Sequence, residues 1–406
     1  MAKHFVIVGG GQAAAQTIQT LRQNKFDGKI TLVGDEIYPP YQRPPLSKKY
    51  MAGELQRARL FLRPLPFYEN NNVDLQLGTR AVEIDPINSR IRLDNDRILK
   101  FDGLMLATGS RVRRLKLPGS NLEGIHYVRT LADVDAIIPR LRTAKRLVII
   151  GAGYIGLEAA AVSVSTGLEV TILEATERAM ARTVSSEIST FYSDYHVRSG
   201  VNLKYSTTVN RFEGNGHVRA VETVGGQKFN CDLVIVGIGI EPEIELAETA
   251  GLPCKDGIIV DEFACTESQN IFAAGDCANH PSQLLNKRIR LESVQNAIDQ
   301  AKTAAKSFLG DKTPYSAVPW FWSDQYDLKL QIAGLSKGYD QILVRGNPKQ
   351  APFAVFYTRL GQVISVEAVN FPQAFMIGKQ LISTGTPVEN NKLVDMGFDL
   401  KALVKR

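Results

Sequence analysis

The feature that most constrains the fold of this chain is a segment that occurs twice. KHFVIVGGGQAAAQ at residues 3–16 and KRLVIIGAGYIGLE at residues 145–158 share a basic start, four apolar residues, a glycine-rich turn and small residues that favour a helix. A short apolar run before a glycine turn predicts a buried strand, and the residues after it predict a helix. The repeat therefore predicts two separate nucleotide-binding units.

Each copy continues into a second apolar run that is followed by an acidic residue, at 29–33 and at 169–173. This order predicts a βαβ crossover in a parallel sheet for each copy. Residues 104–110 and 232–239 predict short buried strands that break at glycine, and residues 293–309 predict a long helix. After Pro314 the alternating runs favour a small antiparallel α+β domain.

The first glycine motif is Gly9-x-Gly11-x-x-Ala14, directly between the predicted strand and helix. Gly9 permits the tight turn, Gly11 lets the backbone approach a pyrophosphate, and Ala14 allows close packing of helix on strand. Asp35 is positioned to accept hydrogen bonds from a ribose, and the neighbouring Glu36 is the alternative. A glycine turn that only packs a helix is the competing interpretation.

The second motif is Gly151-x-Gly153-x-x-Gly156, and Glu174 closes the strand that follows. A carboxylate there accepts both ribose hydroxyls and repels a 2′-phosphate, which favours NADH over NADPH. Arg178 and Arg182 are a counter-indication, because either side chain could instead hold a 2′-phosphate. Two dinucleotide sites in one chain are typical of a bound FAD and an exchanging nicotinamide, the pair that a hydride-transfer enzyme needs.

Composition excludes several classes of function. The net charge of +6 over 406 residues is spread along the chain, which argues against a nucleic-acid binder and suits an acidic protein partner. Apolar runs are of strand length, so no membrane segment is expected. The four cysteines have no Cys-x-x-Cys spacing, and Met1–His4 leave no room for a signal peptide, so we expect a cytoplasmic protein without a metal site.

Five motifs in sequence order resemble the flavoproteins of the glutathione reductase fold: GxGxxA, Tyr41–Lys48, Ala107-Thr-Gly109, GxGxxGxE and Gly275-Asp276. Within that group, Arg43–Lys48 (RPPLSK) and Pro319–Gln325 (PWFWSDQ) resemble the ferredoxin reductases of oxygenase and cytochrome P450 systems. The resemblance extends from about residue 3 to about residue 390.

The fold class that follows is α/β, with two Rossmann-like dinucleotide-binding domains and a C-terminal α+β domain. We expect a discontinuous FAD-binding domain at residues 1–112 and 241–313, an NAD-binding domain at 113–240, and the C-terminal domain at 314–406. By the motifs and the resemblance, the residues expected to bind FAD are Gly9, Gly11, Ala14, Asp35, Arg43, Lys48, Ala81, Ala107, Gly109, Gly275, Asp276, Ser293, Val294 and Trp322. Those expected to bind NADH are Gly151, Gly153, Ile155, Gly156, Glu158, Glu174, Arg182 and Gly239.

The resemblance implies catalytic roles for Lys48, Glu158, Tyr154 and Trp322. Lys48 would lie near the flavin ring and pair with Glu158, while Tyr154 and Trp322 would line the nicotinamide pocket. A purely structural ion pair is the alternative for Lys48 and Glu158. Ordinary core packing is the alternative for the tryptophans, and a turn or helix cap for Asp276.

Two absences narrow the class. Disulfide reductases of this fold carry a cysteine pair in the stretch that corresponds to residues 40–50, where this chain has none, and use a C-terminal His-Glu dyad. The five histidines all precede residue 281, and His280 is expected in a loop or at the surface. The pattern favours an electron carrier without a thiol relay.

The predicted function is therefore an NADH-dependent ferredoxin reductase. Hydride passes from NADH to N5 of FAD, and single electrons then pass to a [2Fe–2S] ferredoxin that supplies a cytochrome P450 or another oxygenase. Candidate docking residues are Arg290, Lys302 and Trp320. Alternatives are a rubredoxin reductase and an NADH-responsive flavoprotein similar to the apoptosis-inducing factors.

Overall fold

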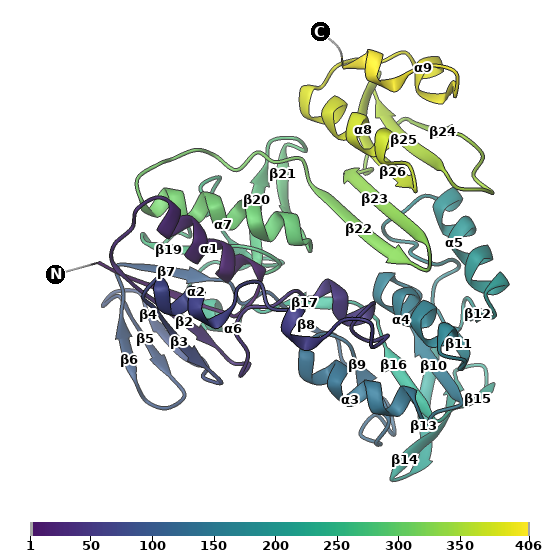
Figure 1. Cartoon of the computed structure of the whole chain (residues 1–406), viewed down its shortest axis with the longest axis horizontal. Helices are drawn as coiled ribbons and strands as arrows, with labels where there is room; N and C mark the ends of the chain where they lie inside the picture. Colours follow the sequence, from purple (N-terminus) through teal and green to yellow (C-terminus); the bar gives the residue numbers. More distant parts are fainter. Residues whose placement is uncertain (1–2, 405–406) are drawn as a thin grey trace. The chain divides into compact units, whose positions relative to one another are not determined.

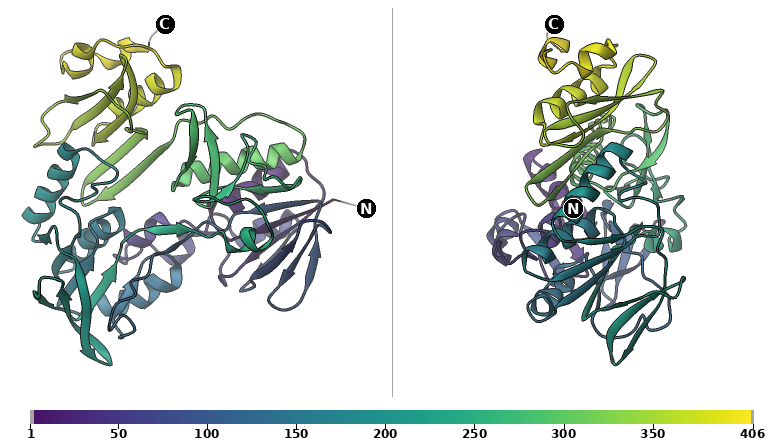
Figure 2. Two further views of the ribbon diagram at one scale, coloured as in Figure 1. Left: turned by 180° about the vertical axis from the view of Figure 1, so that it is seen from behind. Right: turned by 90° about the vertical axis from the view of Figure 1, so that its right-hand side faces the viewer.

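The structure is a computed structural model that describes residues 3–404 and divides into two compact units. The first unit contains the chain up to Gln42 together with Arg57–Arg111 and Glu241–Pro319. The second contains Arg43–Gln56, Val112–Ile240 and the chain from Trp320 onward. Figure 1 labels the elements of both units, and Figure 2 shows them from two further sides.

A five-stranded parallel sheet forms the centre of the first unit. In spatial order its strands are β19 (Ile271–Ala273), β7 (Gly103–Leu106), β1 (His4–Val8), β2 (Lys29–Gly34) and β3 (Val73–Leu77). Phe5, Val6 and Ile7 of the first apolar run are fully buried. A strand of continuous apolar residues fits a parallel sheet that is covered on both faces.

The two faces of β1 contact different layers, because successive side chains of a strand point in opposite directions. Phe5 and Ile7 pack in one core cluster with helices α1 (Gln12–Gln23) and α7 (Val294–Phe308), which lie side by side in Figure 1. Val6 and Val8 pack in another cluster with the antiparallel strands β4 (Ala81–Asp85), β5 (Arg90–Leu93) and β6 (Ile98–Lys100). Smaller elements complete the unit: η2 (Arg57–Arg59), α2 (Leu65–Asn70), α6 (Glu245–Thr249), β18 (Ile258–Ile259), β20 (Ala278–Ser282) and β21 (Lys287–Arg290).

The second unit contains a parallel sheet of the same design. Its strands are β12 (Asn202–Lys204), β11 (Glu169–Leu173), β10 (Arg146–Ile150), β16 (Leu233–Val236) and β9 (Ile125–Tyr127). Val148 and Ile150 share a core cluster with the antiparallel strands β13 (Val209–Asn215) and β14 (His217–Thr223), which continue into β15 (Lys228–Asn230). The helices of this part are α3 (Leu131–Leu141), α4 (Tyr154–Ser165) and α5 (Ser186–Arg198).

An antiparallel sheet with helices forms the rest of the second unit. The strand order is β22 (Trp320–Gln325), β23 (Leu328–Gly334), β26 (Gln362–Val369), β25 (Phe353–Arg359) and β24 (Gln341–Arg345). Helix α8 (Pro372–Thr384) packs on β26 and β23, and α9 (Asn390–Val394) and η3 (Leu400–Leu403) follow it. The segment Arg43–Gln56 contributes the short helix η1 (Pro44–Ser47).

The predicted fold class is confirmed. Each copy of the repeat forms a strand, a glycine turn and a helix, and each belongs to its own parallel sheet. The helix predicted at 293–309 is α7 with its two capping residues. Residues 113–240 and 314–406, predicted as separate domains, fall mainly within one compact unit. Their division into three domains stays a prediction.

Candidate cofactor and active site

The first glycine turn leaves open space at the start of α1. Gly9 has a φ of +114°, and a Cβ at that position would lie 2.1 Å from the Ala107 carbonyl oxygen, so no side chain fits there. Gly11 caps α1, and no atom lies within 4 Å of the place where its Cβ would be. Ala14 is fully buried where the helix packs on the sheet. The free N–H groups at a helix start attract phosphate, and the turn therefore fits a dinucleotide pyrophosphate.

Two carboxylates follow β2 at the same edge of the sheet. Asp35 is exposed, and Glu36 accepts a hydrogen bond of 2.5 Å from the Tyr41 hydroxyl. Because β1 and β2 are parallel neighbours, their carboxyl ends lie together, with these acids beside the glycine turn. Asp35 and its alternative Glu36 both lie at this edge, and a role in binding a ribose stays a prediction.

Two further strands, β7 and β19, end at this edge. The Ala107 backbone donates to Val8 O at 2.8 Å, and Gly109 follows with a φ of +70°. Gly275 follows β19 after one residue, and the place where its Cβ would be is 3.7 Å from Ala13 Cβ and 3.5 Å from Ala297 Cβ. The strand ends thus bring the turns at 9–11, 107–109 and 275–276 together beside the starts of α1 and α7.

The remaining predicted FAD residues of the first unit have defined local roles. Ser293 is the N-cap of α7, where its hydroxyl accepts from Asn296 N at 3.2 Å, and Val294 is the first residue of the helix. Asp276 accepts from the Ser110 hydroxyl at 2.7 Å. Ala81 is buried at the start of β4.

His280 corrects one expectation. We expected it in a loop or at the surface, but it lies on β20, is only 3% exposed, and hydrogen-bonds with Gln300 at 2.8 Å. Burial lowers its pKa to about 4, so the ring is neutral at neutral pH. The sequence around it gave no periodic signal, because β20 forms a short hairpin with β21.

The second glycine turn has the same geometry as the first. Gly151 has a φ of +102°, and its Cβ would lie 2.4 Å from Gly237 O; a Cβ on Gly156 would lie 2.0 Å from Gly151 O. Gly153, the N-cap of α4, has its nearest neighbour at 4.0 Å from the Cβ position. Gly151 and Gly156 must be glycine because the protein backbone leaves no room for a Cβ. Gly153 instead borders open space, where a ligand fits.

Glu174 is held at the end of β11 by backbone and side-chain donors. One carboxylate oxygen accepts from Ala152 N at 2.6 Å, and the other from the N–H and hydroxyl of Thr176 at 2.8 and 2.7 Å. These bonds aim the carboxylate at the glycine turn while leaving lone pairs for a ribose.

The two arginines that complicated the choice of nucleotide have different surroundings. Arg178 donates to Ala181 O at 2.9 Å and Ser185 O at 3.3 Å, so it shapes the loop. Arg182 is exposed, with one guanidinium nitrogen 3.4 Å from the Cβ position of Gly239. Ile155, also predicted to contact NADH, is 40% exposed at the start of α4.

The predicted ion pair between Lys48 and Glu158 is confirmed. Lys48 Nζ lies 2.7 Å from Glu158 Oε2, and the Glu158 side chain is 2% exposed. The hydroxyls of Ser47 and Ser323 donate to the same carboxylate at 2.5 and 2.6 Å. Burial raises the pKa of Glu158, and Lys48 and the two hydroxyls oppose that rise. We call these four residues the Glu158 cluster.

The two serines are functional candidates that the sequence prediction missed. Both lie inside the quoted motifs RPPLSK and PWFWSDQ, so the motifs were the available signal. Their contacts with Glu158 span 111 and 165 residues of chain, which no local pattern reports.

Aromatic side chains lie on the elements next to this cluster. Tyr154, at the start of α4, stacks obliquely on Phe321 with ring centroids 4.6 Å apart, and burial raises its pKa. Trp320 and Trp322 lie on the same side of β22, as their spacing predicts, with ring centroids 5.7 Å apart. Trp320 also contacts Phe375, and the amino group of Lys379 lies over its ring at 5.4 Å.

The other predicted contacts are less free than expected. Arg43 donates to Arg129 O at 2.9 Å. Arg290 is 11% exposed and forms ion pairs with Asp256 and Glu292, and Lys302 pairs with Asp299 at 3.3 Å. Neither of these two cations is an isolated positive charge available to a partner.

All four cysteines are free thiols. Cys231 and Cys277 are buried, and burial raises the pKa of Cys231 to about 12, which suppresses the reactive thiolate. Across residues 3–404, no helix has both the length and the apolar character needed to cross a membrane.

Comparison with known proteins matches nearly the whole chain. The family model of pyridine nucleotide-disulphide oxidoreductases matches residues 3–301, and that of the reductase C-terminal domain matches residues 320–404. Rhodocoxin reductase of Rhodococcus erythropolis is 42% identical over 99% of this chain and 94% of its own length. Putidaredoxin reductase CamA of Pseudomonas putida is 40% identical, over 99% and 96%. In the crystal structure of the covalent putidaredoxin reductase–putidaredoxin complex, a 40% identical chain superimposes with a TM-score of 0.96, covering 99% of this chain and 98% of that chain.

Proposed function

This chain belongs to the pyridine nucleotide-disulphide oxidoreductase family, and from that premise we propose that it is an NADH-dependent ferredoxin reductase. It takes hydride from NADH and delivers electrons singly to a [2Fe–2S] ferredoxin that serves an oxygenase or a cytochrome P450. The two relatives named above are called rhodocoxin reductase and putidaredoxin reductase, and each matches this chain over nearly its full length. Their names support this class of electron acceptor.

One observation carries the proposal: the segment where disulphide-using relatives carry cysteines holds Lys48 instead, paired with the buried Glu158. Residues 40–50 contain no cysteine, so no thiol can take electrons onward at this position. A fixed cation supports a group that gains negative charge on reduction, without chemistry of its own.

The first unit fits FAD by the space it leaves and the donors it presents. The N–H groups at the start of α1, reached across Gly11, bind the pyrophosphate, and Asp35 or Glu36 binds the adenosine ribose. Asp276 and the start of α7 are offered to the flavin end of the molecule. The chemistry that bound FAD supplies is acceptance of a hydride from NADH and release of two electrons one at a time.

The second unit fits NADH in the same way. The N–H groups at the start of α4, beside Gly153, bind its pyrophosphate, and Glu174 accepts hydrogen bonds from the ribose hydroxyls. The same carboxylate repels a 2′-phosphate, while the exposed Arg182 favours one. Because Glu174 is held by three donors and Arg182 by none of the contacts above, we propose that NADH is preferred.

We also propose that the protein works in the cytoplasm. Free and partly buried thiols without a disulfide among the described residues are what a reducing compartment allows.

The test is reduction of cytochrome c by NADH, measured with and without each [2Fe–2S] ferredoxin encoded in the same genome. We expect at least one ferredoxin to raise the rate strongly, and ferricyanide to be reduced without any ferredoxin. Enzyme that reduces ferricyanide rapidly but responds to none of the ferredoxins would overturn the acceptor. A response to a rubredoxin but to no ferredoxin would make the protein a rubredoxin reductase, the alternative function.

A further inference from the structure

A chain of buried hydrogen bonds approaches Glu158 through β22. The Tyr326 hydroxyl lies 3.1 Å from His196 Nδ1, His196 Nε2 lies 2.9 Å from Gln325 Oε1, and Gln325 Nε2 lies 3.2 Å from Ser323 Oγ. Ser323 Oγ is 2.6 Å from Glu158 Oε1. Ser323 and His196 are fully buried and Gln325 is 1% exposed. We call Tyr326, His196, Gln325 and Ser323 the donor chain.

Each member of the donor chain has one consistent direction of donation. Burial lowers the pKa of His196 to about 4, so at neutral pH the ring carries a single N–H. Burial raises the pKa of Tyr326 to about 12, so its hydroxyl keeps the proton and donates to Nδ1. The ring N–H at Nε2 then donates to Gln325 Oε1, and the amide of Gln325 donates to Ser323.

The direction at Ser323 decides what the chain does. A hydroxyl has one proton, and Ser323 already accepts from Gln325, so its proton goes to Glu158. With the Gln325 amide reversed, the Ser323 proton would face two acceptors, Gln325 and Glu158. The observed orientation removes that competition, and aligned donors strengthen one another in a low-dielectric interior.

We propose that the donor chain positions the ion pair of Lys48 and Glu158, and that Ser323 acts through Glu158. It keeps the carboxylate ionised and aimed at Lys48, so that Lys48 keeps its positive charge where the reaction needs it. The proposal rests on the proposed function for the use made of Lys48, but not for the effect on Glu158.

The charges around Glu158 are few. On η1 and next to it are Ser47 and Lys48, and on α4 itself is Tyr154. Tyr192 on α5 also interacts electrostatically with Glu158, and Asp324 on β22 acts on Tyr192 in the same way. Burial raises the pKa of both tyrosines, so neither changes charge between about pH 5 and pH 9. Glu367 on β26, a second buried carboxyl, also acts on Tyr154, but only Glu158 accepts a hydrogen bond from Ser323. Glu158 is therefore the group whose titration the loss of the Ser323 hydroxyl would move directly.

The test replaces the hydroxyl and follows Glu158 by two readouts in the FAD-loaded protein. In Ser323→Ala, the carboxylate loses one donor and its pKa rises further, so the acid limb of the stopped-flow rate of flavin reduction by NADH moves up by about one pH unit. In an infrared titration, the band of a protonated buried carboxyl persists to a correspondingly higher pH. Glu158→Gln, which removes that band, assigns it.

Ser323→Thr restores the hydroxyl and should return both readouts toward wild type. Gln325→Met removes the donor to Ser323 and should shift both in the same direction by less. Ser365→Ala is the matched control: Ser365 is a 1% exposed serine of the same sheet, and its hydroxyl donates 3.0 Å to Ala333 O. It should lower stability without moving either readout.

An unshifted infrared titration in folded Ser323→Ala would overturn the proposal. The same holds if Ser365→Ala shifts the titration equally, because the effect would then be general. The infrared readout involves no ferredoxin, so it stands even where the assay of the proposed function fails. A shifted infrared titration with an unchanged rate profile would reject the role in the reaction.

Discussion

Two buried glutamates of the second unit both have a raised pKa, but their partners differ. Glu158 has Lys48 at 2.7 Å, whereas Glu367 on β26 is 1% exposed and accepts from Tyr357 OH at 2.8 Å and Ser185 N at 3.0 Å. Without a cation in contact, burial raises the pKa of Glu367 to about 7. Neutral donors alone do not repay the loss of water around a charge.

The raised pKa of Glu367 predicts a loss of stability with rising pH. Between about pH 4.5, its ordinary pKa, and about pH 7, the folded state holds more protons than the unfolded state. Stability from this group is therefore full below that window and falls by about 3 kcal/mol as pH passes through it. Glu367→Gln should be near wild type at pH 5 and more stable at pH 8, as seen in urea unfolding. An equal difference at both pH values would contradict this.

Removal of Lys48 from the Glu158 cluster should destabilise the protein, and more strongly at pH 8 than at pH 5. Lys48→Met leaves a carboxylate buried without its partner and should cost about 3 to 5 kcal/mol at pH 8. At pH 5 the cost should be smaller, because Glu158 can take up a proton. Denaturation midpoints at the two pH values measure this, and NADH-dependent flavin reduction should slow sharply.

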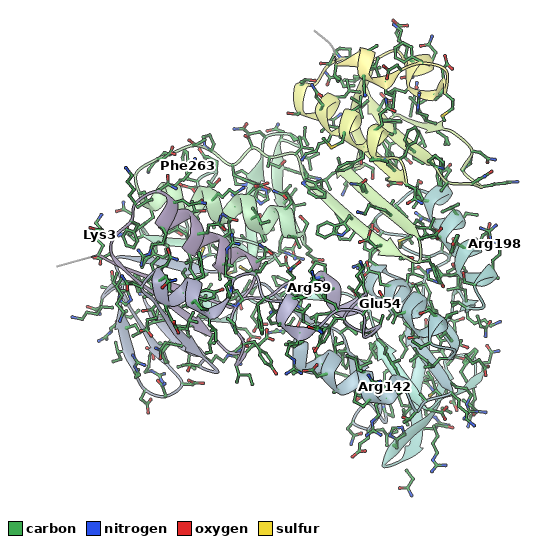
Figure 3. All side chains as sticks on the ribbon, in the orientation of Figure 1. Lys3, Glu54, Arg59, Arg142, Arg198 and Phe263 are labelled. Carbon is green, nitrogen blue, oxygen red and sulfur yellow. The ribbon has the colours of Figure 1, made fainter. Side chains whose placement is uncertain are left out.

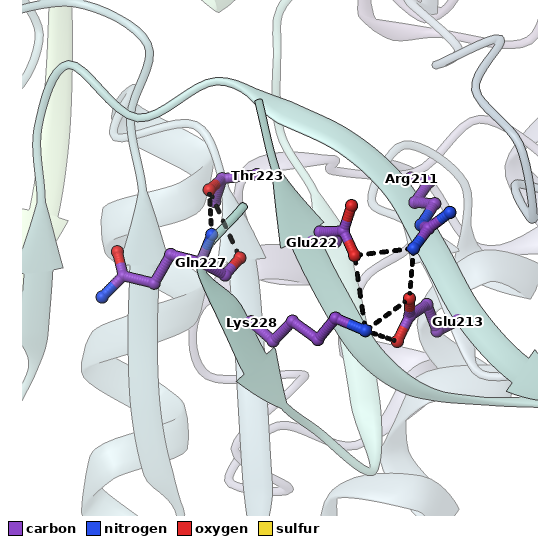
Figure 4. A network of polar contacts seen from close by, with 6 residues as sticks. All are labelled: Arg211, Glu213, Glu222, Thr223, Gln227 and Lys228. Atoms are coloured by element: carbon purple, nitrogen blue, oxygen red, sulfur yellow. Dashed lines mark hydrogen bonds and ion pairs between the residues drawn. The ribbon is translucent and has the colours of Figure 1, made fainter. Parts of the chain in front are cut away.

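A surface lysine supplies the control for that variant. Lys228 bridges Glu213 and Glu222 on the β13–β15 sheet, in a network that also includes Arg211 (Figure 4). Its side chain is 50% exposed, and water replaces the lost contacts. Lys228→Met should leave flavin reduction unchanged, and a comparable slowing would remove Lys48 from the mechanism.

At the residue scale, the sequence predicted the partners of a motif but not their full contacts. Lys48 and Glu158 were paired through the resemblance, and the structure brings them together. Ser323 and His196 were not predicted, because a buried polar chain depends on which strand passes which helix. The same reason explains His280, whose burial follows from a hairpin rather than from its neighbours in sequence.

At the scale of elements, the second glycine turn contains one glycine that the fold requires and one that ligand binding requires. Gly156 has no room for a methyl group, while Gly153 has nothing closer than 4.0 Å. The residue type is the same at both positions, but the reason for it differs.

Alanine at these two positions should therefore give different defects. Gly156→Ala should lower the melting temperature, because the new Cβ meets a backbone carbonyl. Gly153→Ala should melt like wild type but bind NADH about tenfold more weakly, since the methyl group occupies space for the pyrophosphate. Differential scanning fluorimetry and NADH titration measure the two effects. Tight NADH binding by Gly153→Ala would show that the pyrophosphate lies elsewhere.

Glu174, which follows β11, is the residue expected to determine the preference for NADH over NADPH. Glu174→Ala should raise the KM for NADH about tenfold and lower the preference for NADH over NADPH, because a charge-assisted hydrogen bond is lost. Glu169→Ala, at the other end of the same strand, is the control. Values of kcat/KM for both nucleotides measure the preference, and an unchanged ratio would place the selectivity at Arg182 or beyond.

Elements with a strong period or a glycine boundary were predictable, and weak ones were not. Strand β11 and helix α7 occur where the pattern predicts them. The sheet of β13, β14 and β15 was not predicted, since its edge strands alternate irregularly and contain register shifts. Its position is determined by packing on β10 and β16, which is a tertiary effect.

At the scale of the whole molecule, the net charge of +6 is distributed widely. Exposed cations are spread along the chain (Figure 3): Lys3 precedes β1, Arg59 lies on η2, Arg142 follows α3 and Arg198 lies on α5. With Arg290 and Lys302 already in ion pairs, attraction of an acidic ferredoxin depends on the overall field.

The rate of ferredoxin reduction should accordingly fall with added salt. Between about 0.02 and about 0.2 M ionic strength, kcat/KM for ferredoxin should decrease while the ferricyanide rate stays constant. Steady-state assays across this range measure both. A ferredoxin rate that does not depend on salt would assign recognition to apolar contacts instead.

The order of segments in the first unit has a consequence for synthesis. Strand β19, at Ile271–Ala273, completes a sheet whose other strands end by Leu106, and α7 covers that sheet only from Val294. A nascent chain therefore carries four strands with an apolar face that α1 covers without α7 while more than 160 further residues are translated. At about 5–20 residues per second this lasts many seconds, a period in which a chaperone on the ribosome would protect the exposed strands.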